Sequence, residues 1–265
     1  MKLVIFGASG LIGGRLSEFF KKKKINLIKI SRTKKRGFKK INHNSTISLN
    51  NVLKNTDIVI NCIGADVHKS KKFKEAVLLN RKYPKKIYDV ANKNKVRLFI
   101  FISTYHVYDF SKKRISETTR VTAKDNHTKS KILGENQLIK TKKKYTKLLI
   151  VRSCNLFGKA KYPNKNVDNL IINSFIKNIK KNQKFIIKSK KNDIRYYSSL
   201  ENFCNFLYKV IISKKIKYVK KTKVINYTSN KKFSILQLVN YLRKKILLRK
   251  KISPKIFFKH AELNK

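Results

Sequence analysis

Three glycines near the start of the chain have a spacing that suits phosphate binding. Gly7, Gly10 and Gly13 lie in the segment Gly-Ala-Ser-Gly-Leu-Ile-Gly, directly after the apolar run 2–6. Glycine permits a tight turn and lets backbone N–H groups approach a pyrophosphate at the positive end of the following helix. Because the motif joins an expected strand to an expected helix, it predicts a dinucleotide site. The predicted contacts are Gly7, Ser9, Gly10, Leu11, Ile12 and Gly13.

The end of the second apolar run predicts which dinucleotide is bound. In such sites an acid about 20 residues past the loop contacts the ribose of NAD, whereas an arginine there accommodates the 2′-phosphate of NADP. Ser31 and Arg32 follow the run 26–30, and the next acid along the chain is Asp57. Only 11 residues are arginine, so Arg32 is a more specific signal than any lysine. We favour NADP(H) over NAD(H), with Arg32 and Ser31 at the 2′-phosphate; a surface arginine is the alternative.

The elements that position these residues follow from the alternation of short apolar runs with longer amphipathic ones. This pattern predicts strands joined by crossover helices, and the continuously apolar runs suit strands buried on both faces. The expected strands are residues 2–6, 26–30, 57–62, 97–103 and 148–152, and the expected helices are 10–23, 70–92, 126–143, 167–181, 199–212 and 234–248. The fold class is α/β. We expect a Rossmann-type doubly wound parallel sheet over 1–158 and a small C-terminal substrate lobe over 159–265, partly interleaved with it.

Further motifs follow the glycine loop in a recognisable order. They are the segments 57–65, 99–108, 129–135, 151–158 and 195–197, together with Asn80. The chain thereby resembles the extended short-chain dehydrogenase/reductases, the NAD-dependent epimerase/dehydratase family, from residue 1 to about 248. The segment 102–109 with Glu117 is similar to the dTDP-4-dehydrorhamnose reductase branch, whereas the Arg195 segment is closer to the epimerases. The resemblance adds Cys62, Ile63, Gly64, Asn80, Ser103 and Lys131 to the expected cofactor contacts.

The resemblance also implies a catalytic set. The family uses a Ser or Thr hydroxyl and a Tyr-x-x-x-Lys motif, in which the tyrosine carries the proton while hydride moves between a substrate carbon and the nicotinamide. Here the hydroxyl is Thr104, with Ser103 beside it, and the lysine is Lys131, but His127 occupies the tyrosine position. Thr104, His127 and Lys131 are therefore the expected catalytic residues.

The replacement by His127 leaves two readings open. Imidazole has a reference pKa of ~6.5 and is the most frequent general acid or base, so His127 is one candidate for the proton carrier. A positive Lys131 and an oxidised nicotinamide would both disfavour its charged form. Tyr105 or Tyr108 could instead supply a phenol, although their spacing differs from the family's. In the second reading the chain binds NAD(P) but is catalytically silent.

The substrate and partners are also implied by the resemblance. Asn155 and Arg195 match positions that bind a sugar nucleotide, and an arginine fork suits its diphosphate. A salt bridge with a nearby acid is the alternative role for Arg195. Ala76, Leu79, Tyr83 and Val90 suit either a homodimer interface or core packing. We expect a reductase or epimerase that transfers hydride at a sugar keto carbon in surface-polysaccharide precursor synthesis.

Composition limits the other function classes. The 67 Lys and Arg against 13 Asp and Glu give a net charge of +54, which suggests nucleic acid, but the lysines are spread over the whole chain. We therefore expect no specific nucleic-acid partner, and 41% apolar residues exclude a disordered basic tail. No apolar run reaches the ~20 residues of a membrane span. The three scattered cysteines form no disulfide framework or zinc motif, and we expect a cytoplasmic protein without a metal.

Overall fold

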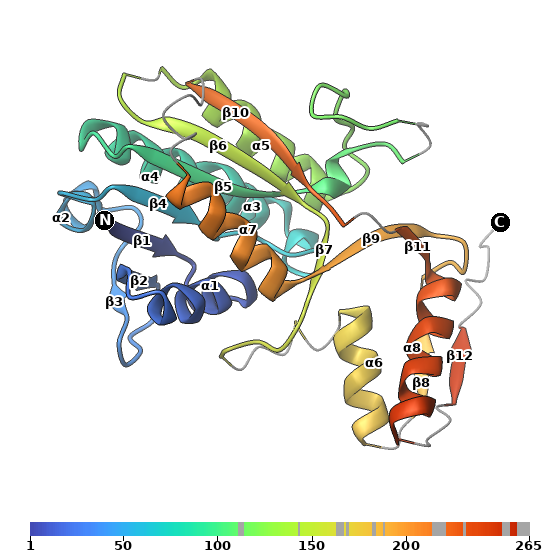
Figure 1. Ribbon diagram of the computed structural model, residues 1–265. Helices are drawn as coiled ribbons and strands as arrows, with labels where there is room; N and C mark the ends of the chain where they lie inside the picture. Colours follow the sequence, from blue (N-terminus) through green and yellow to red (C-terminus); the bar gives the residue numbers. More distant parts are fainter. Residues whose placement is uncertain are drawn as a thin grey trace.

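A seven-stranded parallel sheet forms the centre of the protein (Figure 1). The computed structural model describes residues 1–110, 114–142, 144–162, 167, 170–181, 184–187, 189–213, 221–229, 232–250 and 255–258. The strands are β1 (Lys2–Phe6), β2 (Asn26–Ser31), β3 (Lys39–Lys40), β4 (Ile58–Asn61), β5 (Leu98–Thr104), β6 (Lys147–Ser153) and β10 (Thr222–Tyr227). Their order is β10-β6-β5-β4-β1-β2-β3, so the predicted Rossmann-type α/β class is confirmed.

Strand order reverses beside β1. The chain builds β2 and β3 on one side of β1, then crosses over to place β4, β5 and β6 on the other. Loops at the carboxyl ends of β1 and β4 therefore part in opposite directions and leave a crevice, which is where ligands bind in open α/β sheets.

Helices cover both faces of this sheet, because alternate side chains of each strand point to opposite faces. Leu3 and Ile5 of β1 pack in a core with α1 (Leu11–Lys22) and α7 (Leu200–Ile212). Val4 and Phe6 pack on the other face with α2 (Thr46–Leu53), α4 (Tyr83–Lys93) and α5 (Asn126–Lys140). Both faces are buried, as the continuously apolar strands predict.

The expected helix over 70–92 is interrupted. It consists of the 3₁₀ turn η1 (Lys69–Lys71), α3 (Phe73–Val77), the π-helical turn η2 (Leu78–Lys82) and α4. Pro84 has no N–H to donate to the carbonyl of Asn80, so the ordinary i to i−4 bond is lost there. That carbonyl lies against Gly134 of α5, where an added Cβ would come within 2.0 Å of it. The interruption therefore accompanies a close helix contact at Asn80.

A second group of elements lies apart from the central sheet and packs around a hydrophobic core of its own (Figure 1). It contains α6 (Ile171–Lys180), β8 (Phe185–Ile187), α8 (Ile235–Lys250) and β12 (Ile256–Phe258). The small sheet of β7 (Asn155–Phe157), β9 (Ile194–Ser199) and β11 (Lys232–Ser234) leads toward it. Between these segments the chain returns through α7 and β10 to the central sheet, so the two parts are interleaved.

Two expected helices also differ from the observed ones in their boundaries. The helix expected over 126–143 ends at Lys140, and the one expected from residue 167 begins at Ile171. Residues 143, 168 and 169 of these expected helices lie outside the described residues. Within the described part of the chain, every helix is too short or too polar to cross a bilayer.

Candidate functional site

The glycine loop brings the start of α1 against the ends of β1 and β4. Gly7 has φ +70°, and an added Cβ would lie 2.7 Å from the carbonyl carbon of Cys62. At Gly13 an added Cβ would lie 2.4 Å from the carbonyl oxygen of Gly7. Both contacts are with backbone, so neither position accommodates a side chain without a shift of the chain. Gly10 is the N-cap of α1, and the first-turn N–H groups therefore face the loop without a side-chain cap.

A cavity of about 130 Å³ opens at this loop and gathers most of the predicted cofactor contacts. It is lined by Gly7, Ser9, Gly10, Ile30, Ser31, Arg32, His43, Cys62, Ile63, Gly64, Lys69 and Leu79. Leu11, Ile12 and Gly13 form the adjoining first turn of α1. Two lining residues were not expected from the sequence, because neither belongs to a recognisable motif: His43 lies in the loop after β3, and Lys69 begins the 3₁₀ turn η1. Arg32 is exposed, and within the described residues it has no hydrogen bond or ion pair.

Lys131 and Asn80 lie beside this cavity at Gly64. An added Cβ on Gly64 would be 2.9 Å from Lys131 Nζ and 3.1 Å from Asn80 Oδ1. Asn80 Oδ1 accepts from the Ala65 N–H at 3.1 Å, and its amide donates to Ser130 Oγ at 2.8 Å. These bonds fix the loop after β4 against α5. The π-helical turn at Asn80 is therefore part of the site, which the predicted continuous helix did not indicate.

Lys131 is a buried cation at the end of β5. It is 7% exposed, and its Nζ donates to the Ile102 carbonyl at 3.0 Å. Burial lowers its pKa to about 8, while Glu135 acts in the opposite direction. At neutral pH the ammonium is therefore still mostly charged. Lys131 therefore lies beside the cavity at which it was expected to contact a cofactor.

A buried ion pair supports α5 behind the site. Arg152 Nη2 lies 2.6 Å from Glu135 Oε2, and the two side chains are 6% and 1% exposed. Ser103 Oγ donates to the same carboxylate. Arg152 also donates to Tyr108 O–H, which donates in turn to Asn226 Oδ1 at 3.0 Å. The side chain of Ser103 and the phenol of Tyr108 are thus engaged in this network rather than directed at the cavity.

His127 enters the site from the first turn of α5. Asp125 caps that helix by accepting from the Thr128 N–H at 2.7 Å, which places His127 and Lys131 four residues apart on one face. Burial, followed by the charge of Lys131, lowers the pKa of His127 to about 4. Its Nδ1 is buried without a hydrogen-bond partner among the described residues. The ring is therefore neutral at pH 7.

His106 is a second imidazole, in the 3₁₀ turn η3 (Tyr105–Val107) that follows β5. The Asn155 amide donates to the Tyr196 carbonyl at 3.2 Å, so its oxygen faces His106 Nε2, at 3.1 Å. This arrangement makes Nε2 the N–H donor of His106. Burial lowers the pKa of His106, and Arg195 and Asp125 also act on it electrostatically. Its position two residues after Thr104 was the sequence signal that could have revealed it.

Three further residues that the sequence singled out are Thr104, Tyr105 and Arg195. Thr104 ends β5, is 9% exposed and accepts from the His106 N–H at 3.2 Å, so its own hydroxyl proton remains available. Burial raises the pKa of Tyr105 to about 12. Arg195 forms an ion pair with Asp193 at 3.3 Å, which is the salt bridge considered as an alternative to substrate binding.

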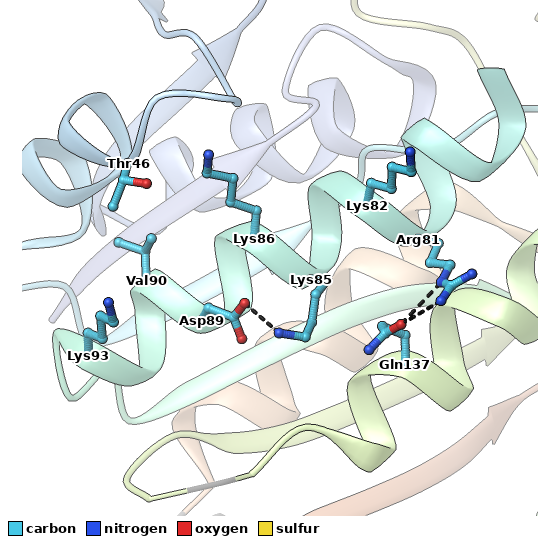
Figure 2. Close-up of a pocket in the computed structure, with 9 residues that line it drawn as sticks. All are labelled: Thr46, Arg81, Lys82, Lys85, Lys86, Asp89, Val90, Lys93 and Gln137. Carbon is cyan, nitrogen blue, oxygen red and sulfur yellow. Dashed lines mark hydrogen bonds and ion pairs between the residues drawn. The ribbon is translucent and has the colours of Figure 1, made fainter. Parts of the chain in front are cut away.

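A larger hollow, of about 570 Å³, lies elsewhere, over the outer face of α4 (Figure 2). Figure 2 shows Arg81 hydrogen-bonded to Gln137 and Lys85 paired with Asp89, while Lys82, Lys86 and Lys93 complete a basic lining. Three of the four apolar residues that suit either a dimer interface or a core are buried, since Ala76 is 0% exposed, Leu79 2% and Val90 4%, and Tyr83 is half-buried against the same core. They pack in the core, and the outward surface of α4 is basic.

The buried imidazole of His43 should make the stability of the fold sensitive to acid. Burial and Arg32 lower its pKa to about 4. The unfolded chain, at ~6.5, takes up this proton first, so stability falls as pH drops from 6.5 to 4. The difference between the two pKa values corresponds to roughly 3 kcal/mol of stability. Urea unfolding at pH 7 and pH 4.5 measures this loss. We expect His43→Phe to show a smaller loss than the unaltered protein, and equal losses would contradict the assignment.

The sequence profile of the NAD dependent epimerase/dehydratase family matches residues 3–222. The chain therefore belongs to this family of NAD-dependent enzymes, which confirms the resemblance and the predicted enzyme class. No curated protein sequence matches the chain.

Three solved structures show the same fold at low identity. MoeE5 in complex with UDP-glucose and NAD has a TM-score of 0.83 and 14% identity, covering 100% of this chain and 87% of its own. UDP-glucuronic acid 4-epimerase from Bacillus cereus, with UDP-glucuronic acid and NAD, has a TM-score of 0.80 and 20% identity, and the match covers 98% of this chain and 86% of the epimerase. A dTDP-4-dehydrorhamnose reductase from Clostridium acetobutylicum has a TM-score of 0.77 and 20% identity, and the match covers 99% of this chain and 85% of the reductase.

Proposed function

We propose that this protein is an NAD(P)-dependent reductase or epimerase that transfers hydride at a keto carbon of a nucleotide-activated sugar. The observation that carries this proposal is the juxtaposition of the glycine-loop cavity with Lys131, whose ammonium donates to Ile102 near the end of β5, the strand that Thr104 ends. The residues fit a dinucleotide, because Gly7 and Gly13 leave no room for a Cβ and the start of α1 is uncapped. The solved neighbours that hold NAD and UDP-sugars support it by analogy.

The chain's own groups have distinct tasks in this proposal. A bound nicotinamide supplies or accepts the hydride. Thr104 donates its hydroxyl proton in a hydrogen bond to the sugar oxygen, and Lys131 holds the ribose. His127 is neutral, so its imidazole can accept the proton of a sugar hydroxyl as hydride leaves the carbon that bears this hydroxyl. This state suits the oxidative half of an epimerisation, in which the proton carrier begins as a base.

The test measures turnover by the unaltered protein, His127→Phe and His127→Tyr. The probe substrates are UDP-glucose, UDP-glucuronic acid and a dTDP-4-keto-6-deoxy sugar. We expect turnover by the unaltered protein and a loss of ~100-fold or more in His127→Phe. We expect His127→Tyr to retain turnover, with its pH dependence moved toward that of a phenol. The control is His68→Phe, at an exposed position. NAD(P)H binding without turnover, and turnover gained only in His127→Tyr, would instead identify the catalytically silent alternative.

The finer assignments belong to the same proposal. Arg32 at the end of β2 supports NADP(H) over NAD(H), and Arg195 near His106 supports binding of the sugar diphosphate by the lobe over 159–265. We assign the reaction to the synthesis of surface-polysaccharide precursors. The free cysteines suit a reducing cytoplasm. A homodimer would avoid the outer face of α4, because two copies of its basic lining would repel.

A further inference from the structure

The two-stranded sheet of the C-terminal lobe, formed by β8 and β12, has one apolar face in the core and one in solvent. Phe185 and Ile187 of β8 pack in the lobe core, together with the alternate residues of β12. The residues between them point away from that core. Ile186 is 56% exposed and Phe257 is 49% exposed, and the two are direct partners in the parallel register. Two large apolar side chains therefore lie side by side in solvent.

Two lysines continue this exposed face. Lys184 and Lys255 each lie two residues before one of the two apolar side chains, so they are on the same side of the sheet. The Phe185 N–H donates to the Lys255 carbonyl at 3.1 Å, which extends the ladder to the lysines and places them on neighbouring strands. Both lysines are exposed, and Lys184 Nζ lies 5.7 Å from the centroid of the Phe257 ring. Because like charges on neighbouring strands repel, a negative group between them would be stabilising.

The rest of the lobe has the same combination of exposed apolar side chains and positive charge. Most of the large apolar side chains that are exposed among the described residues belong to the stretches 170–195 and 232–258, including Leu248 of α8 at 71%. The sequence of these stretches contains a single acid, Asp193, which is paired with Arg195. Lysine occurs over the whole chain, so the exposed apolar side chains are the distinctive feature. A surface of this composition suits a partner that is both apolar and negatively charged.

We infer that the lobe face, made of Lys184, Ile186, Lys255 and Phe257, docks on the surface of a bilayer that contains anionic lipids. The lysine stems are long enough to keep their ammonium groups at the lipid phosphates while the two apolar side chains enter the boundary of the acyl chains. A second copy of the chain fits less well, because it would bring lysines against lysines. An acidic protein fits less well because the exposed apolar side chains line neither of the two cavities described above.

The position of the lobe is compatible with this docking. Figure 1 shows α6 and α8 running away from the central sheet, with β8 and β12 beside them. The lobe face therefore lies apart from the glycine loop at the end of β1, and docking there leaves the cofactor cavity open. The inference goes beyond the proposed reaction, since it gives the protein a location and does not depend on a bound dinucleotide.

The first experiment is co-sedimentation of the full chain with lipid vesicles. One set of vesicles contains phosphatidylcholine alone, and the other contains about 30% phosphatidylglycerol as the anionic lipid. We expect binding to the anionic vesicles at ~0.15 M salt that weakens but persists at ~0.5 M salt, because the apolar part of the contact is not screened. Binding to the neutral vesicles should be at least ~10-fold weaker.

A pair of double variants tests the apolar part of the lobe face. Ile186→Ser with Phe257→Ser removes both apolar side chains, and circular dichroism checks that the fold is kept. Ile47→Ser with Val67→Ser is the matched control, because these two apolar side chains are also exposed but lie outside the lobe. We expect the lobe variant to bind anionic vesicles ~10-fold or more weakly, and the control to bind as the unaltered protein does.

A second pair tests the charges. Lys184→Gln with Lys255→Gln should weaken binding to anionic vesicles by ~10-fold or more at ~0.15 M salt. Lys22→Gln with Lys74→Gln removes the same number of charges from exposed positions outside the lobe, and it should cost at most ~2-fold. The comparison separates a defined docking surface from general attraction by the +54 charge.

Three results would overturn the inference. The first is the absence of binding to anionic vesicles by the unaltered protein. The second is an equal loss in the lobe variants and their controls, which would assign vesicle binding to the charge of the whole chain. The third is retention on immobilised polyglutamate that depends on Lys184 and Lys255, without vesicle binding, which would assign the lobe face to an acidic protein. Failure of the proposed function is a separate result, because it is measured as absent binding of NADH and NADPH.

Discussion

Replacing Lys131 with methionine should abolish turnover and weaken binding of the nicotinamide dinucleotide while leaving the protein folded. Methionine retains most of the buried stem but removes the ammonium that donates to the Ile102 carbonyl beside Gly64. A charged hydrogen bond at a buried site contributes about 1.5–3 kcal/mol, so we expect a ~10- to 100-fold loss of affinity for NADPH. Turnover should fall further, because Lys131 also positions the ribose next to the reacting carbon.

The matched control for this substitution is Lys129→Met on the same helix. Lys129 is exposed, and its ammonium lies over the Phe73 ring, away from the cavity. Both variants lose one positive charge of the +54, so any general attraction of anions to the protein changes equally. Fluorescence titration with NADPH at 0.15 M salt measures the difference. Equal affinities for the two variants would remove Lys131 from the cofactor site.

Glu135→Ala should destabilise the fold by about 3–5 kcal/mol, the largest stability effect that we expect of a single substitution. Glu135 accepts from Arg152 through two nitrogens and from Ser103, and it is 1% exposed. Its removal leaves Arg152 charged, buried and without a carboxylate. Because Glu135 also opposes the lowering of the Lys131 pKa, the variant should bind NADPH less well as pH rises above neutrality.

A double substitution separates the cost of an unpaired charge from the value of the pair. Glu135→Leu with Arg152→Met replaces both charges by apolar side chains, which is often neutral for a buried pair. We expect the double variant to recover at least half of the stability lost in Glu135→Ala, as measured by urea unfolding. A double variant less stable than Glu135→Ala would show that the pair itself, rather than the orphaned Arg152, determines stability.

The sequence predicted the central strands and the glycine loop because local signals determine both. Strands buried on two faces are continuous apolar runs, and the strict spacing of Gly7, Gly10 and Gly13 reflects backbone contacts that exclude a Cβ. The short strand β3 contains only Lys39 and Lys40, so no apolar run marks it. The edge strand β10 is only partly buried, and its pattern is correspondingly weak.

The parts of the site that sequence reasoning missed depend on tertiary contacts. A regular helix was the natural expectation for 70–92, but Pro84 and the approach of Gly134 produce the π-helical turn that directs Asn80 to Ala65. His43 lies in a loop after a two-residue strand, and only the fold brings it to Arg32. His106 was within reach of sequence reasoning, since it lies between Thr104 and Tyr108 in a motif that had been singled out.

The +54 charge makes non-specific attraction of anionic nucleotides the main competing explanation for any binding, because it needs no cavity. Such attraction is screened by salt and does not saturate at one ligand per chain. Binding at the glycine loop depends on backbone N–H groups and on the shape of the cavity, so it should saturate and persist in salt.

The most direct test is therefore a titration of the protein with NADPH, followed by nicotinamide fluorescence, at 0.15 M and 0.5 M salt. We predict saturation at one NADPH per chain at both salt concentrations, and displacement by 2′,5′-ADP. Absence of saturable binding by either NADPH or NADH at 0.15 M salt would contradict a cofactor site at the glycine loop.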